Sequence, residues 1–155
     1  MFQDEVTVSI PTAGGSLSST SGDASFVFSN GAFTQTVLLT YRHLLHDENT
    51  GSLQGIGHTY DLTAVYLDTG HLAQLVSGET YTVTVSYTDA EVGPASEDTL
   101  RLYGWDGEAW SQQGITSTVE VGENLLTAQV DHLSLFAVLW ETHRAFLPVV
   151  LDNQQ

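Results

Sequence analysis

The sequence predicts an all-β protein, an antiparallel β-sandwich of short strands with little or no helix. Apolar and polar residues alternate in many segments, most regularly in 81–87, and this alternation is typical of a strand with one buried face. Turn residues separate these segments at intervals of roughly 8 to 12 residues, the spacing expected of a sandwich. No segment sustains the 3.6-residue period of an amphipathic helix.

The first half of the chain contains four segments with strand patterns. In the first of them, Val6, Val8 and Ile10 share one face, and Pro11 ends the strand because it lacks a backbone N–H. The polar, glycine-rich stretch from His46 to Gly57 predicts a loop. The four predicted strands span residues 5–10, 24–28, 34–44 and 59–66.

The second half predicts one strand, an acidic loop over 88–98, two hairpins and a final strand. Asp106-Gly107 is a strong hairpin signal between two aromatic segments, and the turn around 122–124 predicts a second hairpin. The final strand, 134–140, is apolar on both faces over 135–139, so we expect it at the centre of a sheet. The predicted strands span residues 81–87, 100–105, 110–113, 119–121, 125–130 and 134–140.

The length and hydropathy of the chain favour one β-sandwich domain over residues 1–145, followed by a C-terminal tail over 146–155. A chain of 155 residues with 41% hydrophobic content supports one sizeable core. The tail begins with an apolar segment in which Pro148 disfavours a central sheet position, so we expect an edge strand or an extended tail.

Targeting signals are not evident in the sequence. No apolar run approaches the roughly 18 to 20 residues needed to cross a bilayer. The first five residues lack the charged and apolar regions of a signal peptide. We therefore expect no membrane span, and we expect a soluble module that is flanked by other domains of a larger protein.

Charge and cysteine content narrow the functional classes. The net charge of −16 comes from 19 acidic residues against 3 arginines, with no lysine. Such a chain repels nucleic acid. The absence of cysteine excludes thiol chemistry and disulfides. A lysine-free, acidic chain rich in Ser, Thr and Gly is common among secreted bacterial repeat domains, so an extracellular or cell-surface location in a bacterium is expected.

Two stretches resemble known families of self-cleaving domains. The run Asp-His-Leu-Ser-Leu-Phe-Ala-Val-Leu over 131–139 resembles the GPS motif, the proteolysis site of adhesion-receptor GAIN domains, in which His-Leu precedes Thr or Ser and a Phe-Ala-Val-Leu strand. It is also similar to the His-Phe-Ser site of self-cleaving ZU-five domains. Residues 14–33 resemble the opening of a ZU-five domain, with Asn30 in place of a proline. Because the cysteines of the receptor version are absent, a ZU-five-like homologue on a bacterial surface is favoured.

The resemblance implies that the domain cuts its own bond between Leu133 and Ser134. The residue types suit this chemistry, because the Ser134 hydroxyl can attack the carbonyl of Leu133 in an N-to-O acyl shift, and water can then hydrolyse the ester. His132, with a reference pKa of about 6.5, is suited to accept the serine proton and return it to the leaving amine. Asp131 and His58 are expected as auxiliary residues.

Cleavage would produce two fragments, 1–133 and 134–155, which we expect to stay associated without a covalent link because the apolar strand holds the smaller one. A bend at the cleavage site would store strain, about 1 kcal/mol for an ω deviation of about 12° and about 1–3 kcal/mol for an unfavourable φ/ψ. The reaction would occur once per chain, with no activity on other substrates.

Two other functions fit the same sequence. A structural or adhesive module of a surface protein would keep the fold without the reaction. A carbohydrate-binding module would use Tyr103, Trp105 and Trp110 as a platform for a sugar ring, although such aromatics more often fill a sandwich core.

Metal and cofactor sites are not expected. The histidines at 43, 46, 58 and 71 show no regular ligand pattern with a carboxylate. The acidic residues at 89, 91, 97 and 98 carry the oxygen ligands that Ca²⁺ prefers, but they lack the ordered spacing of an EF-hand, so a solvated face is favoured.

Overall fold

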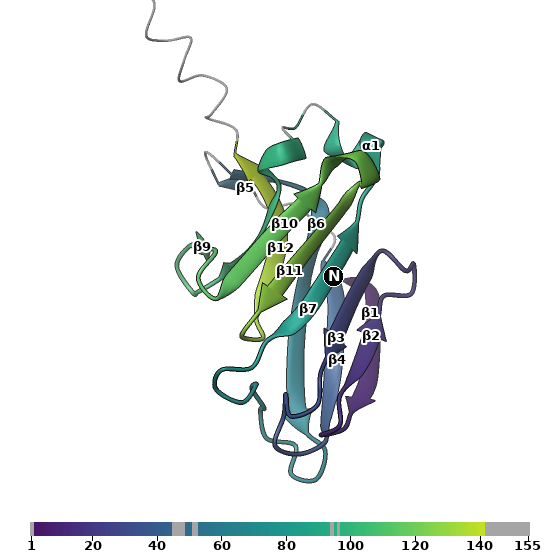
Figure 1. Cartoon of the computed structure of the whole chain (residues 1–155), viewed down its shortest axis with the longest axis vertical. Helices are drawn as coiled ribbons and strands as arrows, with labels where there is room; N and C mark the ends of the chain where they lie inside the picture. The colour runs from purple at the N-terminus through teal and green to yellow at the C-terminus, as the bar shows by residue number, and fades with distance from the viewer. Residues whose placement is uncertain (1, 45–48, 51–52, 94, 96, 142–155) are drawn as a thin grey trace, which may run out of the picture.

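The computed structural model describes residues 2–44, 49–50, 53–93, 95 and 97–141 (Figure 1). In the first half the strands are β1 (Phe2–Ile10), β2 (Gly15–Ser18), β3 (Ala24–Phe28), β4 (Val37–Leu44), β5 (Asn49–Thr50) and β6 (Leu53–Tyr66). In the second half they are β7 (Tyr81–Ser86), β8 (Arg101–Trp105), β9 (Trp110–Ser111), β10 (Ile115–Glu120), β11 (Leu125–Val130) and β12 (Leu135–Glu141). The helices are α1 (Asp89–Val92) and two 3₁₀ turns, η1 (Glu97–Thr99) and η2 (Val121–Glu123).

The strands form two antiparallel sheets, which confirms the predicted all-β sandwich. One sheet has seven strands in the order β1-β4-β6-β12-β8-β9, with β5 paired to β6. The other has five strands in the order β10-β11-β7-β3-β2. In Figure 1 the five-stranded sheet lies in front of the seven-stranded one. All strand pairs are antiparallel, an arrangement that short connections between strands can form.

The core lies between the two inner faces, where the alternating apolar side chains of both sheets meet. Aromatic rings make much of it, and Tyr60 contacts rings from both sheets, Phe26 at 5.1 Å and Phe136 at 5.5 Å between centroids. The largest fully buried side chains are Tyr60, Tyr81, Phe26, Phe33, Phe136, Ile10, Leu17, Leu39, Leu62, Leu100, Leu102 and Leu126.

The predicted position of the last strand is confirmed. β12 pairs with β6 on one side and β8 on the other, so it lies inside the seven-stranded sheet. Phe136, Ala137, Val138 and Leu139 are fully buried. A strand covered on both faces must be apolar throughout, which is why its sequence does not alternate. The hairpins β8–β9 and β10–β11 also form where the turn signals predict them.

The predicted loop over 46–57 is wrong at its C-terminal end, because β6 already begins at Leu53. The glycines suggested a loop, yet they serve a bulge within the strand. Opposite β12 the register jumps, so that Ala137 faces Thr59 while Leu139 faces Gly55. Gly57, with φ of 99°, supplies the backbone conformation that this bulge requires.

The predicted acidic loop over 88–98 contains α1. Thr88 and Glu91 form a capping box, in which the Thr88 hydroxyl accepts from the Glu91 N–H and the Glu91 carboxylate accepts from the Thr88 N–H. No helix among the described residues is long and apolar enough to cross a membrane. His46, Pro148 and the whole predicted tail lie outside the described residues.

Candidate functional site

The segment that resembles a proteolysis site is the connection between the two sheets. β11 ends at Val130 in the five-stranded sheet, and β12 begins at Leu135 in the seven-stranded sheet. The chain therefore crosses the sandwich within Asp131–Ser134, which we name the crossing segment. The bend that the sequence predicts between two strands is confirmed.

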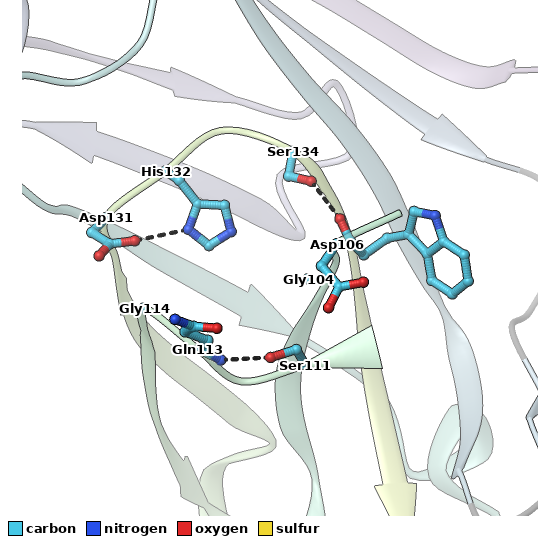
Figure 2. Close-up of a pocket in the computed structure, with 9 residues that line it drawn as sticks. Gly104, Asp106, Ser111, Gln113, Gly114, Asp131, His132 and Ser134 are labelled. Carbon is cyan, nitrogen blue, oxygen red and sulfur yellow. Dashed lines mark hydrogen bonds and ion pairs between the residues drawn. The ribbon is translucent and has the colours of Figure 1, made fainter. Parts of the chain in front are cut away.

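An open cleft of about 430 Å³ lies beside the crossing segment. Figure 2 shows the side chains that converge on it from the crossing segment, from the β8–β9 hairpin and from the turn before β10. The lining residues are Gly104, Trp105, Asp106, Ser111, Gln113, Gly114, Asp131, His132 and Ser134. Three predicted site residues, Asp131, His132 and Ser134, thus line one cleft.

His132 is held by the carboxylate that precedes it. Its Nδ1 lies 2.8 Å from Oδ1 of Asp131, and 36% of its side chain is exposed. An ionised carboxylate only accepts hydrogen bonds, so Nδ1 carries the proton and Nε2 keeps a free lone pair. The ring contacts Phe136, with 5.5 Å between centroids.

Two glycines make room for this histidine and its partner. A Cβ on Gly104 would lie 3.3 Å from Nε2 of His132, closer than nearly all ordinary contacts. A Cβ on Gly114 would overlap the carboxylate of Asp131, and Gly114 also has φ of 76°. The carbonyl of Gly114 accepts from the N–H of Asp131 at 3.1 Å. The turn before β10 therefore fixes the backbone of Asp131 and leaves room for its carboxylate.

Ser134 is hydrogen-bonded away from the imidazole. Its hydroxyl donates to the carbonyl oxygen of Trp105 at 3.0 Å. Figure 2 shows the hydroxyl directed toward that carbonyl and not toward His132. An attack by Ser134 on the preceding carbonyl therefore requires a change of its χ1 rotamer, which is a small motion for a partly exposed serine.

The peptide units before and after the one that joins Leu133 to Ser134 are hydrogen-bonded, whereas that unit is not. Upstream, the carbonyl of His132 accepts from the Tyr81 hydroxyl at 2.9 Å, and the N–H of Leu133 donates to Oε1 of Gln74 at 3.3 Å. Downstream, the carbonyl of Ser134 accepts from the N–H of Leu62 at 3.0 Å. Among the described residues, no hydrogen bond is made by the Leu133 carbonyl or the Ser134 N–H.

The crossing segment contains no left-handed residue. Asn124 is the only non-glycine residue with positive φ in the part of the chain that the structure describes. The expected strain at Leu133–Ser134 thus does not take that form. The Leu133 side chain is 7% exposed and belongs to the main core, so burial anchors the residue on the N-terminal side of the bond.

His58, the other auxiliary residue predicted, lines a different cleft of about 480 Å³. It is 6% exposed, and its Nε2 lies 3.0 Å from Glu91 while its Nδ1 lies 3.9 Å from Asp23. The His43 ring lies 6.3 Å from it, and Nε2 of His43 is 2.8 Å from the carbonyl of Gly57. We name His58, Glu91, Asp23 and His43 the His58 cluster.

The residues considered for other ligands already have partners. Within the described residues, no three His, Asp or Glu side chains are arranged to hold a metal ion. Glu97 accepts from the Tyr87 hydroxyl, and Asp89 accepts from Asn124. Tyr103 and Trp110 are buried in a small second cluster of the core, so only Trp105 of the three predicted aromatics is substantially exposed.

Sequence patterns did not identify Gln74, Tyr81, Gly104 or Gly114 as part of the site. Gln74 and Tyr81 contact residues 59 and 51 positions away in the chain, and no local pattern reports such a contact. The two glycines resemble ordinary turn and strand glycines until the fold places them against His132 and Asp131.

The fold and the site together define a β-sandwich domain with a histidine–carboxylate pair beside an inter-sheet crossing. No family model matches the chain, and no curated protein matches it. The resemblance to ZU-five and GAIN domains therefore stays a prediction.

Proposed function

We propose that this domain cleaves its own peptide bond between Leu133 and Ser134. The observation that carries the proposal is the isolation of that peptide unit. Its two neighbours are hydrogen-bonded, whereas among the described residues its own carbonyl and N–H are not. An amide without hydrogen bonds, at the edge of a cleft, has only its own resonance to keep it planar and is open to a nucleophile.

The Asp131–His132 pair supports the proposal because it supplies a base. Asp131 fixes the tautomer of His132 with Nε2 unprotonated, and Nε2 faces the cleft that Ser134 also lines. This is the role of the carboxylate in a serine–histidine–aspartate arrangement, where it orients the imidazole and stabilises its charged form. General base catalysis of this kind contributes about 10²- to 10⁴-fold in rate.

The reaction needs no group beyond this chain and one water. The Ser134 hydroxyl leaves the Trp105 carbonyl, loses its proton to His132 and bonds to the carbonyl carbon of Leu133. The bond from that carbon to the nitrogen of Ser134 breaks, and the nitrogen receives the proton. The resulting ester is hydrolysed by water to the carboxylate of Leu133 and the free hydroxyl of Ser134.

The smaller fragment is expected to remain bound after the cut. β12 lies between β6 and β8, and its residues 136–139 are fully buried. Its release would break two ladders of hydrogen bonds and expose core side chains, at about 25 cal/mol per Å² of apolar surface. The product is thus a non-covalent heterodimer of 1–133 and 134–155.

Intact mass of the purified protein under denaturing conditions tests the proposal. The wild type should yield two masses that correspond to 1–133 and 134–155, and Ser134→Ala should yield one. Ser111→Ala is the matched control, because Ser111 lines the same cleft and its hydroxyl only accepts from the N–H of Gln113. A wild type that keeps its full mass after prolonged incubation near neutral pH would refute self-cleavage.

A non-cleaving structural module is the second candidate. The hydrogen bond from Ser134 to the carbonyl of Trp105 favours it, because this bond joins the crossing segment to β8 and engages the nucleophile. In that case the intact mass of Ser134→Ala would differ from that of the wild type by one oxygen atom only. The main effect of the substitution would be a loss of about 1 kcal/mol of stability.

A further inference from the structure

We infer that Tyr81 and Gln74 act as a clamp that positions the scissile bond, a role that rests on the self-cleavage proposed above. The clamp is defined by two hydrogen bonds to one peptide unit. This peptide unit joins His132 to Leu133. The Tyr81 hydroxyl donates to the His132 carbonyl, and the Gln74 side chain accepts from the Leu133 N–H. Neither residue contacts the reacting atoms, so both are positioning residues.

Tyr81 is a rigid half of the clamp. It is 1% exposed, and its ring stacks on Phe28 with 4.6 Å between centroids and 17° between planes. In the five-stranded sheet it is paired with Val130, the last residue before the crossing segment. Burial first, and then the nearby Tyr60 and Asp131, raise the pKa of Tyr81 well above its usual range. The hydroxyl thus stays protonated near neutral pH and can donate.

Gln74 is the other half, and it comes from a different element. It lies in the connection between β6 and β7, next to Ala73, which is buried and whose N–H donates to the carbonyl of Ala64 at 2.9 Å. This bond fixes the connection against β6. The exposed Gln74 side chain then reaches the crossing segment, where its Oε1 lies 3.3 Å from the N–H of Leu133.

The two bonds fix the plane of the peptide unit that precedes the scissile one. Only φ and ψ of Leu133 separate the two planes, and burial of the Leu133 side chain restricts both. The clamp therefore sets the direction of the scissile carbonyl relative to Ser134. A misplacement of about 1 Å between reacting groups reduces a rate by about 10²-fold, so loss of either bond should slow cleavage measurably.

The rate of cleavage after cell-free synthesis, followed by denaturing electrophoresis from pH 6 to 8, tests the clamp. Tyr81→Phe keeps the ring and removes the donor, and we expect cleavage slower by about 10- to 100-fold. Tyr87→Phe is its matched control, because it also removes a hydrogen-bonding hydroxyl from a buried tyrosine, here one that donates to Glu97. This control should cleave at the wild-type rate.

Gln74 allows a second pair of variants that does not depend on a core position. Gln74→Met removes the acceptor and should slow cleavage, whereas Gln74→Glu keeps an acceptor oxygen and should restore the rate to within a few-fold of wild type. The midpoint of the pH–rate profile should be unchanged in Tyr81→Phe, Tyr87→Phe and Gln74→Met, which add no charge, because His132 and not the clamp takes the proton. If Gln74 had a purely structural role, its substitution would lower the stability, but Gln74→Glu and Gln74→Met would not differ in cleavage rate.

The outcomes separate the clamp from the cleavage itself. If the wild type cleaves, and Tyr81→Phe and Gln74→Met cleave equally fast, the clamp is overturned while self-cleavage stands. If Tyr81→Phe does not fold, as judged by urea unfolding, the Gln74 pair decides alone. If the wild type does not cleave at all, the proposed function fails and the clamp fails with it.

Discussion

Two histidines of this protein are held by carboxylates, yet their surroundings differ. His132 is half-exposed, its partner Asp131 is the preceding residue, and only Nδ1 is engaged. His58 is buried, and both of its nitrogens face carboxylates, Glu91 at 3.0 Å and Asp23 at 3.9 Å. The same residue types thus give one side chain with a free nitrogen in a cleft and another with a carboxylate near each nitrogen.

The difference indicates how each histidine is used. His58 lies on β6 of the seven-stranded sheet. Asp23 immediately precedes β3 and Glu91 belongs to α1 after β7, so both lie next to strands of the five-stranded sheet. His58 therefore joins segments that belong to the two sheets. His132 is hydrogen-bonded to the residue before it and packs on Phe136, and its free Nε2 is what general base catalysis requires.

The largest expected effect comes from removing each imidazole in turn. His132→Ala should slow cleavage by about 10²- to 10⁴-fold, because the base is lost, and should change the free energy of unfolding by less than about 1 kcal/mol. His58→Ala should leave cleavage close to wild type but lower the free energy of unfolding by about 1–3 kcal/mol, because a buried hydrogen-bonded group is lost.

Intact mass over time and urea unfolding measure the two effects separately. Unfolding is best compared in the Ser134→Ala background, where every chain has the same covalent structure. If His58→Ala were well folded and failed to cleave, the contrast between the two histidines would be broken.

A smaller effect on cleavage is expected from substitution of Gly114, because the Asp131 carboxylate occupies the space that a side chain at Gly114 would fill. Gly114→Ala places a methyl group on the Asp131 carboxylate, whereas Gly70→Ala meets no atom within 4 Å. The two glycines have φ of 76° and 78°, so both substitutions carry the same backbone penalty of about 1–2 kcal/mol.

Only Gly114→Ala should also displace Asp131 and slow cleavage, by about 10-fold or more. The free energy of unfolding and the cleavage rate of the two variants, measured side by side, isolate the contribution of the carboxylate. Equal cleavage rates would mean that Asp131 does not orient His132.

The fold was largely predictable because its signals are local. Alternation in 81–87 places Tyr81, Val83 and Val85 in the core, and Asp106-Gly107 gives the hairpin between β8 and β9. The apolar run of β12 was enough to predict a central strand, since only a strand covered on both faces tolerates it.

The parts that were not predicted depend on contacts between distant residues or on competing signals. Gly57 has the composition signal of a loop, but in the structure it lies in a β-bulge. The bulge arises from the pairing of β6 with β12, which is a contact between distant residues. The capping box of Thr88 and Glu91 is visible in the sequence, but the surrounding acidic residues favoured a loop. The clamp joins residues far apart in the chain, so no local pattern could predict it.

The smallest expected effect concerns acid sensitivity, which should arise in the His58 cluster. Burial alone would raise the pKa of Asp23, but hydrogen bonds from Ser19 and Ser21 and the nearby His58 and His43 outweigh it, so the pKa is lowered. The unfolded chain then takes up this proton first as the pH falls. The stabilisation by Asp23 is therefore complete above its unfolded value of about 3.9 and is lost as the pH falls through the lower folded value.

Asp23→Asn tests this assignment. The variant should be less stable than the wild type near neutral pH, and the difference should shrink below about pH 4, where the wild type also loses the charge. Urea unfolding at several pH values, in the Ser134→Ala background, measures it. Cleavage should be unaffected, because Asp23 and the crossing segment line different clefts. A constant stability difference at all pH values would show that folding does not lower the pKa of Asp23.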